Sequence, residues 1–372
     1  MLLSAALIVR NEERFLGACL SSIKDLVDEA VVVDTGSTDR SREIAIEHGA
    51  RVEEFAWTAD FSAARNRALD LARGGWILYI DADETVRAGL FREVRAQLTE
   101  PERVGYYVNL YPRPACTPYR VLRLFRNDPR IRFRGIIHEN VWPSILEQGW
   151  GTMVGVAPLT LDHFGYEGDQ RHKHARNLPL LHKSLRQDPT RVFAWCHLAD
   201  IYLALGKPRR AEWAWCKALD LVRSRTTTAQ DDHLPYSRLI ESMIERGDNS
   251  DNLLREALDR FPSNAWLWWL HGRAMAGQKE FSKAISSFER VLAFGKAGDF
   301  DPYVAYDARL FGALAYEALG GCCFRLGAFG ESRRYYELAA ACDPERLEYR
   351  TKRALCARLE HSGAPPPARE SR

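Results

Sequence analysis

The chain has 372 residues, with 52 Lys and Arg against 50 Asp and Glu, so its formal net charge is +2. This length predicts two or three domains of about 150 residues each. The apolar content of 46% and aromatic content of 11% exclude a wholly disordered chain. The near-zero charge disfavours a dedicated nucleic-acid coat or a polybasic membrane tether.

The first half of the chain alternates strand and helix patterns. Apolar, β-branched runs predict strands at residues 3–9, 30–33, 51–55 and 76–80, with helical patterns between them. Strands separated by helices of this length indicate βαβ units on a parallel sheet. The N-terminal run has the pattern of a strand rather than of a secretory signal, because a basic start and a cleavage site are missing.

The second half, from about residue 170 to 360, is predicted to be all-helical. Three segments fit the 34-residue tetratricopeptide pattern, around 195–218, 268–288 and 316–344, the middle one weakly. We therefore expect a first domain at 1–168, a helical-repeat domain at 169–361 and a disordered tail at 362–372. The longest apolar run spans six residues, 265–270, whereas a membrane span needs about 20.

The eight cysteines are scattered and form no CxxC pair. A chain of this length does not need disulfide bonds to stabilise a core, so we expect reduced thiols in a cytoplasmic protein.

Polar clusters follow the predicted strands, where ligands bind in open α/β sheets. Arg10-Asn11-Glu12 follows the first strand, Asp34 ends the second, and Asp81-Ala82-Asp83-Glu84 follows the fourth. Two carboxylates at a rigid strand end suit a hard divalent cation, which can neutralise a diphosphate. A polar turn that only caps the strand is the alternative for the DxD pair.

Asp34 strengthens the nucleotide interpretation because a Gly/Ser/Thr turn follows it, at residues 35–39. A carboxylate here can hydrogen-bond a base or ribose, while turn N–H groups face phosphate. The sequence has neither a GxGxxG after the first strand nor a GxxxxGK[ST], which disfavours a dinucleotide site and a P-loop.

These residues together resemble a known family. The motifs VDTGSTD at 33–39, W-x3-FSAARN at 57–66 and DADE at 81–84 occur in the order found in glycosyltransferase family 2. The resemblance implies the α/β GT-A fold, with a Rossmann-like mixed sheet. The chain is similar to the subgroup that joins such a domain to tetratricopeptide repeats, including the S-glycosyltransferases of bacteriocin peptides such as sublancin. The resemblance implies an inverting transfer of a sugar from a nucleotide-sugar donor, with UDP favoured, and a Mg²⁺ or Mn²⁺ cofactor.

The resemblance also implies roles for residues on the donor side. Asp34 matches the acidic residue at the base or ribose, and Asp81 and Asp83 match the DxD pair. Asp83 is the expected direct metal ligand, and Asp81 is assigned to both metal and ribose. His163 resembles the C-terminal histidine that completes the metal or diphosphate site.

Two further segments match donor-side motifs of the family. Arg10, Asn11 and Glu12 match its first donor-side loop. Arg65 and Asn66 match the ARN motif beside the nucleotide, although a solvated helix residue remains the alternative for Arg65.

An inverting transfer needs a base that takes the acceptor proton. Family relatives have a G-x-x-H-E segment similar to Gly135–Glu139, which makes Glu139 the expected base and His138 a metal or phosphate contact. The reverse assignment, with His138 as the base, stays open, as does a purely structural pair.

Other features are interpreted as structural. Arg123 and Arg126 are expected on a solvated strand face, although a diphosphate or acceptor contact is the alternative. The run Arg171-His172-Lys173-His174 is expected to be a solvated basic helix face. Trp266, Trp268 and Trp269 are expected in the core between repeat helices.

Three functions compete. The first is a metal-dependent glycosyltransferase whose repeats hold a peptide or protein acceptor, since stacked helix pairs suit extended peptides. The second is a transferase that builds a cell-surface glycan or lipid-linked oligosaccharide. The third is a repeat scaffold with an inactive transferase domain, which Asp34, Asp81, Asp83 and Glu139 disfavour. Neither nucleic acid nor a transmembrane segment is expected, and the oligomeric state is open, with a homodimer among the alternatives.

Overall fold

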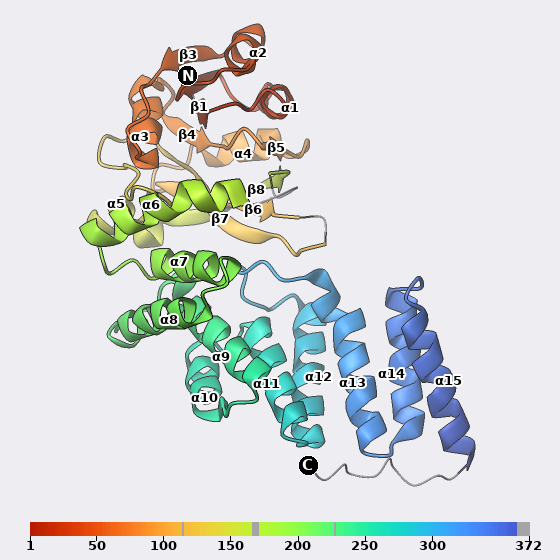
Figure 1. Ribbon diagram of the computed structural model, residues 1–372. Helices are drawn as coiled ribbons and strands as arrows, with labels where there is room; N and C mark the ends of the chain where they lie inside the picture. Colours follow the sequence, from red (N-terminus) through yellow and green to blue (C-terminus); the bar gives the residue numbers. More distant parts are fainter. Residues whose placement is uncertain (114, 166–170, 227, 363–372) are drawn as a thin grey trace. The chain divides into compact units, whose positions relative to one another are not determined.

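The computed structural model describes residues 1–113, 115–165, 171–226 and 228–362. The chain folds into two compact units (Figure 1). The first comprises Met1–Pro114 and Pro118–Ala194, and the second comprises Ala115–Thr117 and Trp195–Arg372. The expected boundary at 168–169 lies outside the described residues, and so does the expected tail from residue 363 onward. Both stay predictions.

The first unit is built on an eight-stranded mixed sheet with the strand order β3-β2-β1-β4-β7-β6-β8-β5. Its strands are β1 (Leu3–Val9), β2 (Glu29–Asp34), β3 (Arg51–Glu54), β4 (Trp76–Tyr79), β5 (Glu84–Val86), β6 (Gly105–Tyr111), β7 (Tyr119–Arg126) and β8 (Val154–His163). The four strands predicted from the sequence are β1 to β4. They pair in parallel, with Val9 opposite Asp34 in the register of β1 and β2.

The other half of the sheet departs from this parallel order. Strand β7 runs antiparallel to both β4 and β6, whereas β6 and β8 are parallel to one another. The short strand β5 pairs antiparallel with β8, which brings Glu84 opposite His163. The expected fold class, a mixed-sheet α/β GT-A domain followed by an all-α region, is confirmed.

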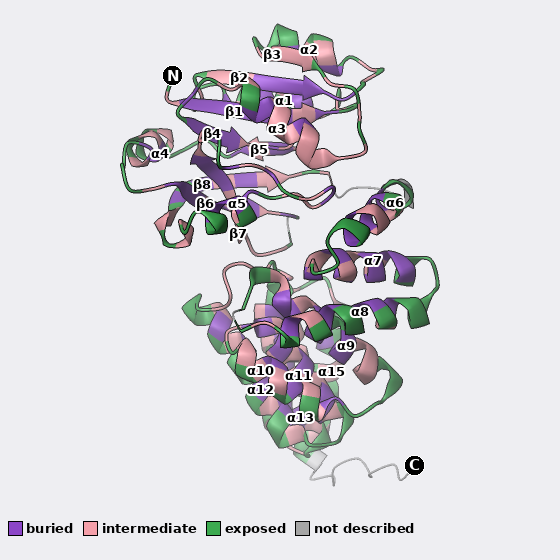
Figure 2. Ribbon diagram, turned by 90° about the vertical axis from the view of Figure 1, so that its left-hand side faces the viewer, coloured by how far each residue is buried: buried purple, intermediate pink, exposed green. Residues whose placement is uncertain are grey.

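Helices cover both faces of the sheet. The helices of the first unit are α1 (Leu16–Ile23), α2 (Ser41–Glu47), α3 (Phe61–Leu71), α4 (Phe91–Gln97), α5 (Trp142–Glu147) and α6 (Arg171–Gln187). Leu3, Ala5, Leu7 and Val9 pack with α1 and α4 on one face, while alternate residues such as Ala6 pack with α3 and α5 on the other. Strand β1 is thus buried along most of its length (Figure 2), as expected from its nearly continuous apolar sequence.

The second unit is helical. Its helices are α7 (Val192–Ala204, which begins in the first unit), α8 (Pro208–Arg223), α9 (Leu234–Arg246), α10 (Asp251–Arg260), α11 (Ala265–Gly277), α12 (Phe281–Ala297), α13 (Ala313–Arg325), α14 (Phe329–Cys342) and α15 (Leu347–Ser362). The three predicted repeat copies coincide with the pairs α7–α8, α11–α12 and α13–α14. Glycine lets two of these pairs approach closely, because a Cβ at Gly272 would overlap the Phe288 ring and one at Gly320 would lie 3.1 Å from the Tyr336 ring.

The tryptophans of α11 pack as expected. Trp266, Trp268 and Trp269 are partly buried against a core that includes Val291 and Tyr306. The Trp269 and Phe288 rings lie 5.0 Å apart between centroids.

A short segment from the loop between β6 and β7 belongs to the second unit. Thr117 N–H donates to the Tyr306 carbonyl at 2.8 Å, and Ala308 N–H donates to the Ala115 carbonyl at 2.8 Å. Cys116 and Asp307 form an isolated antiparallel bridge. No helix in the described ranges is both long enough and apolar enough to cross a membrane.

Candidate active site

The loops after β1 and β2 are tied together at the carboxyl ends of the strands. Asn11 adopts a left-handed backbone conformation, with φ of 58°, which asparagine tolerates better than most residues. Its side-chain oxygen accepts from Thr38 N–H at 2.8 Å, and its own N–H donates to Ser37 Oγ at 3.0 Å. Glu12 N–H donates to Ser41 Oγ at 2.7 Å. The two loops therefore hold each other in place, and Arg10 is exposed beside them.

Asp34 is buried at the end of β2 and stabilises the turn that follows it. Its carboxylate accepts from Ser37 N–H at 3.0 Å and from Ser37 Oγ at 2.6 Å. Gly36 has a φ of 103°, a conformation that favours glycine. The VDTGSTD motif thus has a structural role here, and the expected contact of Asp34 with a base or ribose stays a prediction.

Asp81, directly after β4, is held by two arginines. Arg65 Nη2 lies 2.6 Å from Oδ1 and Arg123 Nη2 lies 3.3 Å from Oδ2. Burial favours the neutral acid, but Arg65 and Arg123 outweigh it and hold the pKa of Asp81 well below its usual range. Both oxygens of Asp81 are therefore occupied within the protein.

Arg65 connects the DxD segment to the predicted base. Its Nε donates to Glu139 Oε1 at 2.5 Å while Nη2 contacts Asp81, and its side chain is only 11% exposed. The guanidinium also lies 4.8 Å from the Tyr79 ring centroid. Burial raises the pKa of Glu139, and Arg65 partly opposes that shift. The structure thus unites three residues predicted separately, and Arg65 is not the solvated residue of the alternative.

Arg123 corrects an expectation. Its side chain is buried rather than solvated: it pairs with Glu84 at 2.5 Å and stacks 4.0 Å above the Tyr79 ring centroid. Glu84 is also buried, and burial raises its pKa to about 7 while Arg123 opposes the shift. The contacts of the guanidinium with Glu84, Asp81 and the Tyr79 ring account for its burial. No role was assigned to Glu84 from the sequence, and a diphosphate or acceptor contact of Arg123 was only the alternative to a solvated strand face.

Arg126 lies at the other end of the same strand. Its guanidinium donates to the carbonyls of Arg103 and Glu100 and lies 4.4 Å from the Trp76 ring centroid. These contacts anchor the end of β7 to the loop between α4 and β6, so a structural role accounts for Arg126.

Asp83 faces His163. Asp83 Oδ2 and His163 Nε2 are 3.3 Å apart because β5 pairs with the end of β8. Burial lowers the pKa of His163, but the hydrogen bond and charge of Asp83 more than compensate and raise it. Gly165 is required beside them, since a Cβ there would overlap Asp83 Oδ2. Two of the three expected metal ligands, Asp83 and His163, are thus brought together, whereas Asp81 contacts Arg65 and Arg123; the metal roles of all three stay predictions.

The donor chemistry of this pair can be tested against a divalent ion. No group of three or more His, Cys, Asp or Glu side chains suited to a metal occurs in the described part of the chain. Asp83 and His163 supply two donors. Mg²⁺ is commonly held by one or two carboxylates together with substrate phosphates. The pair therefore fits an ion that binds along with a diphosphate.

Glu12 lies close enough to Asp83 for the two carboxylates to interact electrostatically. Burial and the neighbouring Asp83 raise its pKa to about 7, and Lys173 partly opposes the shift. The first loop and the DxD segment are therefore neighbours, as their positions after β1 and β4 predicted.

The segment before Glu139 is fixed from two sides. Asn66 pairs with the backbone of Phe133, donating to its carbonyl at 3.1 Å and accepting from its N–H at 2.9 Å. Arg191 donates to the carbonyls of Ile137 at 3.0 Å and His138 at 2.7 Å. Asn66 thus positions this loop, and its expected nucleotide contact stays a prediction.

His138 has different surroundings from Glu139. Its backbone is left-handed, with φ of 54°, and its ring packs edge-on against Phe193 with 4.8 Å between centroids. Adjacent residues of one motif are thus directed to different neighbours.

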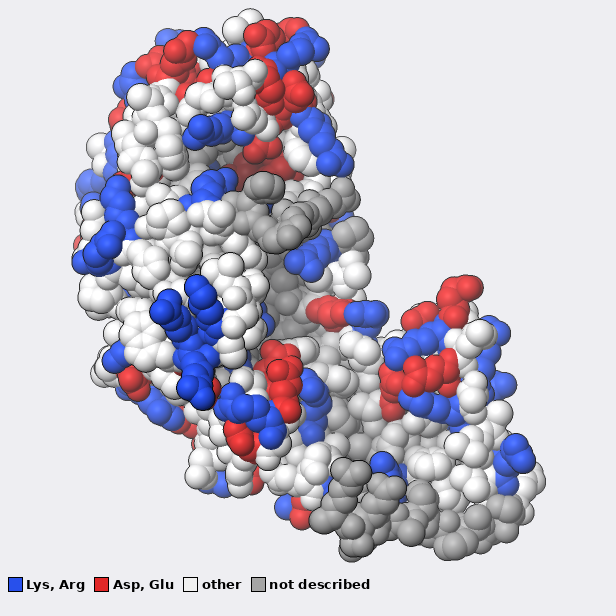
Figure 3. Space-filling view, in the orientation of Figure 1, with Lys and Arg blue, Asp and Glu red and all other residues white. Residues whose placement is uncertain are grey.

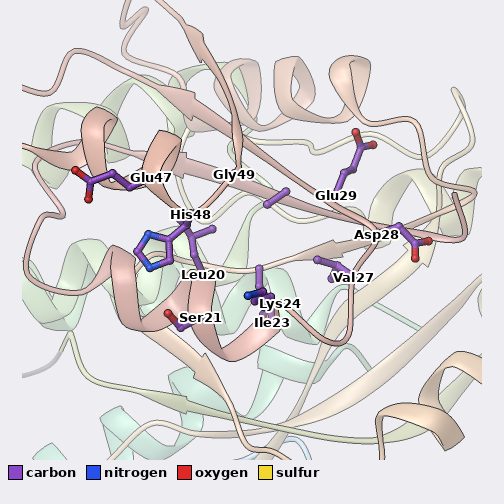
Figure 4. A pocket seen from close by; sticks show the side chains of 11 residues that line it. Leu20, Ser21, Ile23, Lys24, Val27, Asp28, Glu29, Glu47, His48 and Gly49 are labelled. Atoms are coloured by element: carbon purple, nitrogen blue, oxygen red, sulfur yellow. The ribbon is translucent and has the colours of Figure 1, made fainter.

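A pocket of about 450 Å³ lies away from these residues (Figure 4). It is formed by the end of α1, the start of β2 and the end of α2, and Lys24, Glu29 and His48 line it. Since β2 begins there, this is the amino end of the parallel strands, and none of the predicted site residues contributes.

Charges of both signs are interspersed over the face in Figure 3.

With this geometry established, comparison with known proteins identifies the first unit. Residues 4–153 match the family model described as Glycosyl transferase family 2. The N-terminal half therefore carries a family 2 glycosyltransferase domain. The resemblance found in the sequence motifs is confirmed.

Two curated relatives extend the comparison. A TPR repeat-containing protein of Synechococcus elongatus is 39% identical over 224 residues, which cover 58% of this chain and 55% of the relative. The SPbeta prophage-derived glycosyltransferase SunS of Bacillus subtilis is 28% identical over 200 residues, covering 50% and 46%. The chain spans about half the length of the curated relatives it matches.

Among solved structures, the chain is similar to glucosyl-3-phosphoglycerate synthase of Mycobacterium tuberculosis in complex with Mn²⁺, UDP and glucosyl-3-phosphoglycerate. The identity is 18%, the coverage is 50% of this chain and 79% of that one, and the TM-score is 0.38.

Proposed function

We propose that the protein is an inverting, metal-dependent glycosyltransferase that moves a sugar from a nucleotide-sugar, with UDP as the nucleotide, to a peptide or protein. The family 2 domain and the similarity to SunS support the transferase activity. UDP is favoured by the family resemblance alone.

The observation that carries the proposal is the Asp81–Arg65–Glu139 connection. Arg65 contacts Asp81 at 2.6 Å and Glu139 at 2.5 Å, so the end of β4 and the G-x-x-H-E loop share one guanidinium. A donor bound at the DxD segment would then lie next to a buried carboxylate whose pKa is raised by burial. A general base works best when its pKa approaches the working pH.

In the proposed reaction, Glu139 takes the proton of the acceptor hydroxyl or thiol as that atom bonds to the anomeric carbon. The bond from the anomeric carbon to the diphosphate oxygen breaks, and the nucleoside diphosphate leaves with that electron pair. Arg65 holds the Glu139 carboxylate in place and stabilises its charged form before the proton moves. Glu139 is preferred to His138 because the His138 ring packs against Phe193.

Asp83 and His163 would hold the metal. A divalent ion there supplies positive charge to the leaving diphosphate. Asp83 and His163 hold each other in place, with 3.3 Å between Asp83 Oδ2 and His163 Nε2. Gly165 leaves room for the Asp83 carboxylate because it has no side chain.

The helical unit offers a surface for the acceptor. A groove of about 440 Å³ within it is lined by Trp269, Phe281 and Phe288, with Arg273 and Arg325 also contributing. Apolar side chains flanked by guanidiniums suit a peptide that carries apolar and acidic residues. We propose that this groove holds the acceptor peptide.

The test is donor turnover by the full chain with UDP-sugars, with and without Mg²⁺ or Mn²⁺. We expect hydrolysis or transfer that excess EDTA abolishes and that Asp83→Ala lacks. Full activity under either condition would remove the metal from the proposal. Peptide and lipid-linked acceptors compared in the same assay decide the acceptor class, and transfer to the lipid-linked acceptor alone would replace the peptide proposal.

A further inference from the structure

Helix α6 lies beyond the residues matched by the family model, yet it belongs to the first compact unit. Its buried side chains follow a helical spacing and are Asn177, Leu180, Leu181, Ser184 and Leu185. Lys173 and Arg176 lie four residues before Asn177 and Leu180, so they extend the same face by one turn. Lys173 is exposed, as expected for the basic run at 171–174, and Arg176, which lies just beyond that run, is exposed as well.

Lys173 reaches the candidate metal ligands. Its Nζ donates to the Gly165 carbonyl at 2.7 Å. Gly165 lies so close to Asp83 and His163 that a Cβ would overlap Asp83 Oδ2 and would lie 3.2 Å from His163 Nε2. The ammonium is thus brought beside the pair that we assign to a metal and its diphosphate.

Arg176 follows Lys173 by about one turn of α6 and lies near the start of α3. Its guanidinium is 5.5 Å from the Phe61 ring centroid, at the start of α3. Burial and Arg10 lower the pKa of Arg176, while Glu12 and Glu139 oppose the shift. Arg10, Glu12 and Glu139 are therefore all within electrostatic reach of it. The Arg176 side chain is exposed, so an anionic ligand can reach it from solvent.

We propose that Lys173 and Arg176 bind the diphosphate of the nucleotide donor, so that α6 completes the donor site. The inference rests on the proposed function, because it assumes a nucleoside diphosphate at Asp83. Lys173 supplies a point charge near the metal pair, and Arg176 supplies a planar donor on the side of Arg10. The group bound by these two residues is the diphosphate of the donor, and the nucleobase takes no part in this contact.

The experiment measures binding by calorimetry on the full chain with Mg²⁺, using inorganic pyrophosphate, UDP and UMP as probes. Lys173→Met and Arg176→Met should each weaken pyrophosphate and UDP about tenfold, the usual order for a hydrogen bond to a charged group. UMP, which lacks the second phosphate, should change by less than about twofold. Arg176→Lys, which keeps the charge, should recover part of the loss.

The matched control is Arg186→Met, an exposed arginine near the end of the same helix. Equal weakening of UDP and UMP, unchanged pyrophosphate affinity in both variants, or the same loss in the control would overturn the inference and leave the proposed function standing. A wild-type protein that binds none of the three probes would instead overturn both.

Discussion

Asp81 and Asp83 are two residues apart in the DADE motif, but the groups around them differ in kind. Asp81 is held by the guanidiniums of Arg65 and Arg123, which in turn hold the buried Glu139 and Glu84. Asp83 faces one imidazole, and its further neighbours, such as Glu12 and Lys173, come from loops and from α6. The carboxylates near Asp81 are paired with guanidiniums within the protein, whereas Asp83 remains available to a ligand in the proposed function. We therefore propose that one motif supplies a structural carboxylate at Asp81 and a ligand-binding carboxylate at Asp83.

Arg65→Met is the substitution for which we expect the largest effect. The change leaves Asp81 and Glu139 without their shared partner, and removal of one member of a buried ion pair costs about 3–5 kcal/mol. We expect the free energy of unfolding, measured by urea denaturation, to fall by that amount, together with loss of turnover. Arg67→Met on the same helix is the control, because the exposed Arg67–Glu53 pair should contribute less than about 1 kcal/mol. Equal effects of the two changes would contradict a special role for Arg65.

Glu139→Gln separates catalysis from structure on the Asp81 side. The amide keeps the shape and can still accept from Arg65, but it cannot take a proton. Transfer to a hydroxyl acceptor should fall about 10²–10⁴-fold, while UDP affinity stays within a factor of two. A thiol acceptor should be less affected, since a few per cent of thiolate is already present near neutral pH. Wild-type turnover here, with loss in His138→Ala, would move the base to His138.

At the second aspartate of the motif, Asp83→Asn should lower turnover without lowering the free energy of unfolding. The loss of a metal-binding charge should lower turnover about 100-fold, because charge neutralisation by a metal contributes several kcal/mol. The urea midpoint should stay nearly constant, in contrast to Arg65→Met. Initial rates across a Mn²⁺ titration provide the measurement, and a rate independent of Mn²⁺ in the wild type would refute the assignment.

The smallest effect concerns the pH dependence of His163. Its pKa is raised above the ordinary value of 6.5 in the folded protein. The stabilisation is therefore complete below the unfolded pKa and is lost as pH rises through the folded pKa. In EDTA, the contribution of His163 to the unfolding free energy, measured as wild type minus His163→Gln, should fall by less than about 1 kcal/mol as pH rises from 6 to 8. The difference is needed because Glu12 and Glu84, whose pKa values are raised to about 7, titrate in the same range with the same sign. An opposite slope would show that Asp83 does not stabilise the imidazolium.

The sequence was most informative where function depends on strand ends. Asp34, Asp81 and Asp83 could be placed because an apolar run followed by acidic residues marks the carboxyl end of a parallel strand. Arg123 could not be placed, because its burial depends on β7 lying between β4 and β6, a long-range pairing that local patterns do not contain. The basic run at the start of α6 was likewise ambiguous, since a charged helix face has the same spacing whether it faces solvent or a ligand.

The path of the chain between the two units has a practical consequence. Ala115–Thr117 belongs to the helical unit while the strands on either side of it belong to the sheet, and α7 spans the last crossing at Ala194. After a single proteolytic cut near residue 194, the fragment 1–194 therefore still carries the 115–117 segment, whose noncovalent contacts belong to the helical unit. A chimeric enzyme with a foreign repeat array must supply a new partner for the 115–117 segment, and its junction is better placed after α7, at residues 205–207, than inside that helix.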